Sequence, residues 1–380
     1  MSCCGAPQEP SFLDTRLAKW QEIQLRRQAE RISVEEKPIT ITLPDGSTRP
    51  GIAGKTTPME IAKGISSGLA KKVIIAKVDD ATWDLERALT ADCKLQLLDF
   101  DTPEGKNTFW HSAAHILGQA LEIEENAHLC SGPPVEEGFY YDVWMGGKQV
   151  SESFLKLYEA RAQEIIKANQ PFERLELTKE EALELFAYNQ FKCRIISSKI
   201  PDGAWCSAYR CGPLIDLCRG PHVPSTGRVA TLAVTKNSSA YFLSNSENES
   251  LQRVYGVAFP DSKQMKEYQF RMEEAAKRDH RRIGITQDLF RFNELSPGSA
   301  FFSPMGTRLY NTLIEFMRKQ YVAPLPSLYL CNILACTASV ATPKSRRPTF
   351  STCSCGTSAA TPRTTSKTCL CSKWRSRSTR

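Results

Sequence analysis

Residues 109 to 122, FWHSAAHILGQALE, constrain the fold more than any other stretch of this 380-residue chain. The segment has the pattern of a helix, but its apolar side chains surround the helix axis instead of forming a single stripe. Such a helix is typical of a domain interior. His111 and His115 stand four positions apart, so both imidazoles share one helix face, which continues through Gly118 and Glu122.

Two buried imidazoles either find structural hydrogen-bond partners or line a polar site, and this helix alone favours structural histidines. A second stretch, PLIDLCRGPHV, changes that balance. Strand alternation puts Asp216 and Cys218 on one face, and the turn that follows delivers His222 from a loop. The segment YNQFKCRII adds Lys192, which we expect at the start of another strand. We therefore predict one polar site made of His111, His115, Lys192, Asp216, Cys218 and His222.

Three chemistries fit such a site. The set His111, His115, Cys218 and His222 has the donors of a tetrahedral zinc ion. Alternatively, the thiol is a nucleophile activated by an imidazole, although no orienting motif of a cysteine protease is present. In the third interpretation, imidazole and ammonium groups orient and deprotonate a water that attacks an ester.

The rest of the chain predicts a multidomain α+β protein. Residues 38–100 contain a strand and turn, PITITLPDG, then a helix with a capping box from Thr57 to Glu60, then two further strands, which together indicate a β-grasp module. Residues 101–260 alternate helical and strand patterns, as an α+β domain does.

The segments before and after these two domains are predicted to be mainly helical. Residues 1–37 form a partly helical extension, in which 11–32 read as a solvated or coiled-coil helix, or as an RNA-binding arm. In 261–321 we predict one charged helix from 262 to 283, ended by Gly284, and an amphipathic helix from 305 to 321.

The net charge of +7 comes from the C-terminal segment, because residues 322–380 hold nine Lys or Arg and no Asp or Glu. Removing those nine charges leaves about −2 for the rest, so a nucleic-acid contact must use local patches. The fourteen cysteines show no zinc-ribbon spacing, which favours free thiols and a cytoplasmic location. The sequence contains no apolar run of eighteen residues, so we expect no membrane partner.

Several motifs resemble those of eukaryotic cytosolic threonyl-tRNA synthetases. They occur in the order of that family over residues 38 to 321: HSAAH, GPPVEEGFYYDV, DLCRGPHV, LQRVYGVAFPD, EEAAKRDHRRIG and FFSPMGTRLYNTLIEFMR. The resemblance implies that 38–100 is a TGS domain. It also implies that 101–260 is an editing (second additional) domain, which hydrolyses serine mischarged onto threonine tRNA.

The resemblance also implies roles for individual residues. His111 would be the general base or water orienter, Lys192 would hold the attacking water, and Asp216 would complete the catalytic set. His115, Tyr141, Cys218 and His222 would bind the terminal adenosine and seryl group of the tRNA acceptor end. Editing of this type is expected to need no metal, so zinc at this site remains an alternative interpretation.

The chain departs from the family pattern after Tyr321. Residues 261–321 would be a linker helix and the first part of a class II catalytic domain, and the ATP, Mg and Zn sites of that domain are absent. Residues 322–380 are predicted to be disordered, and we interpret them as an out-of-frame translation. We therefore expect editing without aminoacylation. The resemblance implies a homodimer for the full-length family, and the sequence makes no prediction of dimerisation for this chain. The alternatives are a non-enzymatic tRNA-binding or regulatory fragment and a zinc-dependent ester hydrolase.

Overall fold

The computed structural model describes residues 12–30 and 36–322. The N-terminal eleven residues and the segment interpreted as an out-of-frame tail, from 323 on, lie outside this part of the chain. The described residues divide into two units, with the boundary between Arg278 and Asp279. They form a multidomain α+β protein, as predicted, and each unit is described separately. None of the described helices combines the length and the apolar character needed to cross a bilayer.

The β-grasp prediction for the first domain is confirmed. Its five strands are β1 (Pro38–Thr42), β2 (Thr48–Ile52), β3 (Ile75–Val78), β4 (Ala81–Trp83) and β5 (Cys93–Leu98). They form one sheet in the order β2-β1-β5-β3-β4, in which β1 and β5 are parallel. Helices α2 (Pro58–Ile65) and α3 (Ser67–Lys72) complete the domain, and α2 starts with the predicted capping box of Thr57 and Glu60.

The second domain is organised around α4 (Pro103–Glu125). A sheet in the order β12-β13-β8-β6 lies against this helix, with β7 (Pro134–Val135) paired to β8. The strands are β6 (His128–Ser131), β8 (Gly138–Trp144), β12 (Thr231–Tyr241) and β13 (Ser250–Phe259). Helix α5 (Glu152–Lys167) packs on α4 and β12.

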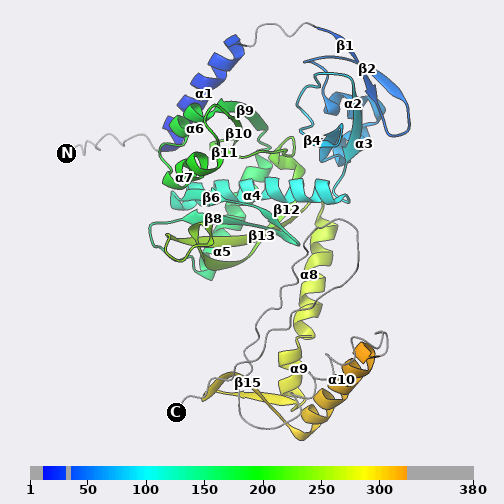
Figure 1. Cartoon of the computed structure of the whole chain (residues 1–380), viewed down its shortest axis with the longest axis vertical. Helices are drawn as coiled ribbons and strands as arrows, with labels where there is room; N and C mark the ends of the chain where they lie inside the picture. The colour runs from blue at the N-terminus through cyan, green and yellow to red at the C-terminus, as the bar shows by residue number, and fades with distance from the viewer. Residues whose placement is uncertain (1–11, 31–35, 323–380) are drawn as a thin grey trace, which may run out of the picture. The chain divides into compact units, whose positions relative to one another are not determined.

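A second sheet, in the order β11-β10-β9, contacts α4 through β11, so the helix lies between two sheets (Figure 1). Its strands are β9 (Phe172–Thr178), β10 (Trp205–Cys211) and β11 (Leu214–Leu217), and helices α6 (Lys179–Leu185) and α7 (Gln190–Lys199) join β9 to β10. The predicted strand at Lys192 is therefore wrong. The Asn189 side chain accepts hydrogen bonds from the backbone amides of Phe191 and Lys192, and it starts helix α7.

The N-terminal helix, α1 (Phe12–Glu30), was interpreted as solvated, and this is wrong for one of its faces. Trp20 and Ile23 are fully buried against apolar residues of the β9–β11 sheet and of α6 and α7. Arg16 is also buried, and its guanidinium donates to the carboxylate of Glu122 on α4. The helix is therefore a packed element of the second domain.

The predicted helix from 262 to 283 is two helices, α8 (Ser262–Lys277) and α9 (His280–Thr286). The Asp279 side chain accepts from the amide of Arg281 and starts the second helix, and Gly284 lies inside α9 instead of ending a helix. In the second unit, the hairpin of β14 (Phe290–Asn293) and β15 (Ser296–Phe302) contacts α9 and α10 (Pro304–Val322). Helix α10 confirms the helix predicted from 305 to 321.

Candidate active site

Helix α4 brings two of the predicted site residues into the interior. The Thr102 side chain accepts from the amide of Gly105, and Pro103 occupies the first turn, so the helix start is fixed. Asn126, in a left-handed conformation, ends the helix. His111 and His115 lie on successive turns between these ends, with their ring centroids 5.1 Å apart.

The β10–β11 hairpin and the turn after it bring in three more residues. Asp216 lies in β11, opposite Tyr209 of β10, and Cys218 follows the end of the strand. The chain then turns at Gly220, which has a φ of +70° and packs so closely on Tyr209 that a Cβ would lie 2.0 Å from the hydroxyl oxygen. This turn directs His222 back towards α4.

Cys218 lies between two imidazoles. Its Sγ is 3.3 Å from Nε2 of His111 and 3.2 Å from Nε2 of His222. One ligand atom from each of His111, His115, Cys218 and His222 lies within 4.8 Å of the others, so these four residues form one His/Cys cluster. His115 and His222 are buried, whereas His111 and Cys218 are partly exposed. The more exposed side of the His/Cys cluster is therefore the side of His111 and Cys218.

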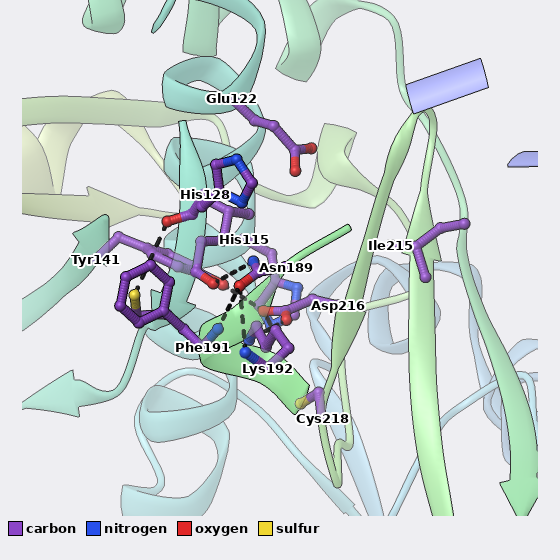
Figure 2. A network of polar contacts seen from close by, with 12 residues as sticks. His115, Glu122, His128, Tyr141, Asn189, Phe191, Lys192, Ile215, Asp216 and Cys218 are labelled. Carbon is purple, nitrogen blue, oxygen red and sulfur yellow. Dashed lines mark hydrogen bonds and ion pairs between the residues drawn. The ribbon is translucent and has the colours of Figure 1, made fainter. Parts of the chain in front are cut away.

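A buried charge pair lies beside the His/Cys cluster. The ammonium group of Lys192 and the hydroxyl group of Tyr141 both contact the carboxylate of Asp216, and Nε2 of His115 is 3.8 Å from it (Figure 2). Lys192 comes from α7, Tyr141 from β8 and Asp216 from β11. All seven residues predicted for the site are thus brought together from four elements and one turn.

Burial sets the protonation states of the three histidines. It lowers the pKa of His111, lowers that of His115 to about 3, and lowers that of His222 well below its ordinary value. Near neutral pH the three rings are therefore uncharged and retain a lone pair that can accept a proton or bind a metal.

The same buried environment changes the pKa of the Cys218 thiol and that of the Asp216 carboxyl group in opposite directions. Burial raises the pKa of Cys218 to about 12, so the sulfur is a thiol near pH 7. Burial would also raise the pKa of Asp216, but the Lys192 ammonium, His115 and the Tyr141 hydroxyl group lower it. The site therefore combines neutral imidazoles with an ionised lysine–aspartate pair.

The residue types of the His/Cys cluster, and two of its distances, fit a zinc site. Bond lengths of about 2.3 Å to sulfur and about 2.0–2.1 Å to nitrogen place tetrahedral ligand atoms about 3.5 Å apart, close to the Cys218–histidine distances. In addition, the buried Nδ1 of His115 has no hydrogen-bond partner among the described residues. His111, His115, Cys218 and His222 would hold the ion.

Sequence reasoning missed the residues that support the site. Ser112 Oγ is 3.0 Å from Nδ1 of His222 and accepts from the amide of Val223. Phe172 stacks on the His222 ring, with centroids 4.9 Å apart. Asp84, which lies in the β-grasp domain, accepts from the amide of His222. The position of Ser112 next to His111 could have indicated its place in the site, whereas no local sequence pattern indicates a role for Asp84.

Two domain families match the chain. Residues 39–99 match the TGS domain, and residues 206–255 match the "Threonyl and Alanyl tRNA synthetase second additional domain". The second match includes Cys218 and His222. The matches define the class: a protein with the accessory domains of an aminoacyl-tRNA synthetase.

The curated relatives compared with the chain are named as threonine--tRNA ligases. The chain is 53% identical over 315 residues to "Probable threonine--tRNA ligase 1, cytoplasmic" of Dictyostelium discoideum, with 83% of the chain and 44% of that protein covered. It is 52% identical over 312 residues to "Threonine--tRNA ligase, cytoplasmic" of Caenorhabditis elegans, with 82% and 43% covered. The human "Threonine--tRNA ligase 1, cytoplasmic" is 48% identical over 315 residues, again with 82% and 43% covered.

Over 82–83% of its length, the chain is therefore similar to threonine--tRNA ligases that are named as cytoplasmic. It spans less than half the length of these curated relatives, and it carries the TGS and second additional domains.

Proposed function

We propose that this chain hydrolyses the ester bond of serine mischarged onto threonine tRNA. The observation that carries the proposal is the neutral imidazole of His111, which lies partly exposed beside Cys218 and the buried Lys192–Asp216 pair. Serine lacks one methyl group of threonine, and a single methyl group supplies only about 1–3 kcal/mol of discrimination. Because binding alone discriminates weakly between serine and threonine, a separate hydrolytic site is needed to remove serine from the tRNA.

In the proposed reaction, His111 accepts a proton from a water molecule as the water oxygen attacks the seryl carbonyl carbon. The bond from that carbon to the ribose oxygen then breaks, and the leaving oxygen takes the proton from the His111 imidazolium. The products are free serine and tRNA with a ribose hydroxyl group. Lys192 orients the water through its ammonium group, and Asp216 holds that group in place through the ion pair.

The remaining residues have binding roles in this proposal. His115, Tyr141, Cys218 and His222 shape the site around the seryl group and the terminal adenosine. Because the sulfur of Cys218 is a protonated thiol, it donates to only one of its two imidazole neighbours and receives an N–H from the other. This arrangement supports a positioning role for the thiol, and a nucleophilic role would need the thiolate.

The partner is the acceptor end of threonine tRNA. Relatives named as cytoplasmic support a cytoplasmic location.

The test uses the full purified chain and threonine tRNA charged with radiolabelled serine. We expect release of serine well above the rate for the tRNA alone, with threonine-charged tRNA hydrolysed more slowly. His111→Ala should lower the rate by about 10²–10⁴-fold, as loss of a general base does. His280→Ala is the matched control, because His280 is exposed in the second unit.

Serine release that is unaffected by His111→Ala would contradict the assigned role. Absence of hydrolysis combined with tight tRNA binding would instead support a non-enzymatic tRNA-binding fragment.

A zinc-dependent ester hydrolase is the second candidate. The three imidazoles, the thiol and their spacing support it. Bound zinc would act as a Lewis acid at this site. Dialysis against a chelator before the hydrolysis assay separates the two candidates, since hydrolysis through His111 alone survives the treatment.

A further inference from the structure

We propose that Asp84 of the TGS domain is a positioning residue of the hydrolytic site in the following domain. This inference rests on the proposed function. Asp84 directly follows β4, and one carboxylate oxygen accepts a hydrogen bond of 2.8 Å from the backbone amide of His222. The other oxygen accepts a bond of 2.7 Å from the hydroxyl group of Tyr209. One carboxylate thus holds both the turn that carries His222 and the tyrosine on which this turn packs.

The turn depends on side chains to satisfy its backbone. The amide of Gly220 donates to the sulfur of Cys218, that of His222 to Asp84, and that of Val223 to Ser112. Cys218 and Ser112 come from the second domain, whereas Asp84 comes from the TGS domain. A buried amide that loses its acceptor must move or stay unpaired. Removing the Asp84 carboxylate therefore releases the main chain at His222.

A shift at His222 passes directly to the reacting groups. The His222 ring contacts Cys218 and Ser112, and Tyr209 packs edge-on against it with centroids 4.5 Å apart. Cys218 in turn contacts His111, the proposed base. Groups that orient catalytic side chains in this way typically affect rates by about 10–100-fold.

Other contacts hold the TGS domain in place and, among the described residues, make no hydrogen bond to the His222 turn. The guanidinium of Arg87 lies 3.7 Å from the centroid of the Trp83 ring and 3.5 Å from a carboxylate oxygen of Glu176. Arg228 donates to the backbone carbonyls of Ala70 and Lys71. Arg87→Ala therefore weakens docking of the two domains while the His222 turn keeps its acceptor, which makes it the matched control for Asp84.

The experiment compares Asp84→Ala, Asp84→Asn and Arg87→Ala in the full chain. Under single-turnover conditions, with the chain in excess over seryl-tRNA, Asp84→Ala should lower the maximal rate constant about 10–100-fold, with little change in the chain concentration that gives half of that maximum. Asp84→Asn should retain most of the rate, because its amide oxygen can still accept from His222. Arg87→Ala should stay within about twofold of the unmodified chain, as expected for a partly exposed ion pair.

A second measurement does not depend on activity. The chain has five histidines, so a sample with labelled imidazole rings gives few NMR signals, each assigned by substitution of one histidine. Asp84→Ala should shift the His222 signal and leave that of His280 unchanged. An unshifted His222 signal would overturn the proposal, as would equal rate losses in Asp84→Ala and Arg87→Ala.

The two measurements keep this inference separate from the proposed function. If the unmodified chain releases no serine but Asp84→Ala shifts His222 selectively, the positioning role stands and the editing activity falls. If the chain is active and Asp84→Ala changes neither the rate nor the His222 signal, the activity stands and the positioning role falls.

Discussion

The guanidinium of Arg16 and the carboxylate of Glu122, 106 positions apart in the chain, form a paired contact with hydrogen bonds of 2.7 and 2.8 Å. Both side chains are fully buried. Arg16 also donates to the hydroxyl group of Tyr188 and to the backbone carbonyl of Pro213, so both terminal nitrogens of the guanidinium have acceptors, whereas its buried Nε has none among the described residues. Because Glu122 lies on the helix that carries His111 and His115, this pair joins the N-terminal helix to the wall of the candidate active site.

The Arg16–Glu122 pair predicts a large, asymmetric effect on stability. Arg16→Met leaves a buried carboxylate without its cation and should lower the free energy of unfolding by about 3–5 kcal/mol. The double variant Arg16→Met/Glu122→Leu should recover much of that loss, because neither charge remains. Denaturant unfolding followed by tryptophan fluorescence measures both.

Arg26→Ala on the same helix is the control, since Arg26 is partly exposed and pairs with Glu22, and it should change stability by at most about 1 kcal/mol. Equal effects of Arg16→Met and Arg26→Ala would contradict a structural role for the buried pair.

Substitution of Gly132 should lower both stability and the hydrolysis rate, because Gly132 packs against Tyr141. A Cβ at Gly132 would lie 2.5 Å from the Tyr141 ring, so Gly132→Ala must displace that ring, whose hydroxyl group contacts Asp216. Overpacking of this kind costs about 1–3 kcal/mol, and we expect the hydrolysis rate to fall with it. Thermal unfolding and serine release test this together.

Gly64→Ala offers the contrast, because its Cβ meets nothing within 4 Å in helix α2, and it should stabilise the chain by about 0.5–1 kcal/mol. A neutral Gly132→Ala would show that the tyrosine has room to move without consequence.

Lys192 and Asp216 predict strong non-additivity. If Asp216 acts by holding Lys192, Lys192→Met and Asp216→Asn should each lower the hydrolysis rate, and the double variant should be little slower than the worse single one. Each single change should cost about 10²–10³-fold, as loss of a preorganised donor does elsewhere. Multiplicative losses in the double variant would mean that the two residues act independently.

The donor set of the His/Cys cluster makes a prediction about metal binding. If zinc occupies the site, zinc at a hundred times its Kd should stabilise the chain by about 2.7 kcal/mol, visible as a rise in the melting temperature. Cys218→Ser should weaken this response, whereas Cys206→Ser, which changes a thiol outside the His/Cys cluster, should leave it intact. An identical response in both variants would place the metal elsewhere.

Local periodicity was sufficient to place the reacting groups on their elements. The helical period predicted that His111 and His115 lie together, as the structure has them. Strand alternation predicted Asp216 and Cys218 on one strand face, whereas Cys218 directly follows the last residue of β11. Lys192 was placed on the wrong element because Ile195 and Ile196 suggested a strand, while the capping side chain of Asn189 starts a helix.

The contacts that support these groups come from distant parts of the chain. Arg16 has the appearance of a solvated charge until Glu122 and the carbonyl of Pro213 surround it. Asp84 likewise gains its role only when the His222 turn is folded against it. Such partners are fixed by tertiary packing, and no local sequence pattern reports them.

Helix α4 is buried at every position from Ser112 to Glu122. Four of those eleven residues have separate roles. Ser112 contacts His222, His115 has a proposed role in substrate binding, Gly118 packs against Tyr141, and Glu122 pairs with Arg16. Few of these positions can therefore vary. A saturation-mutagenesis map of the chain should show residues 112–122 as its least tolerant segment, with larger, smaller and more polar side chains all disfavoured.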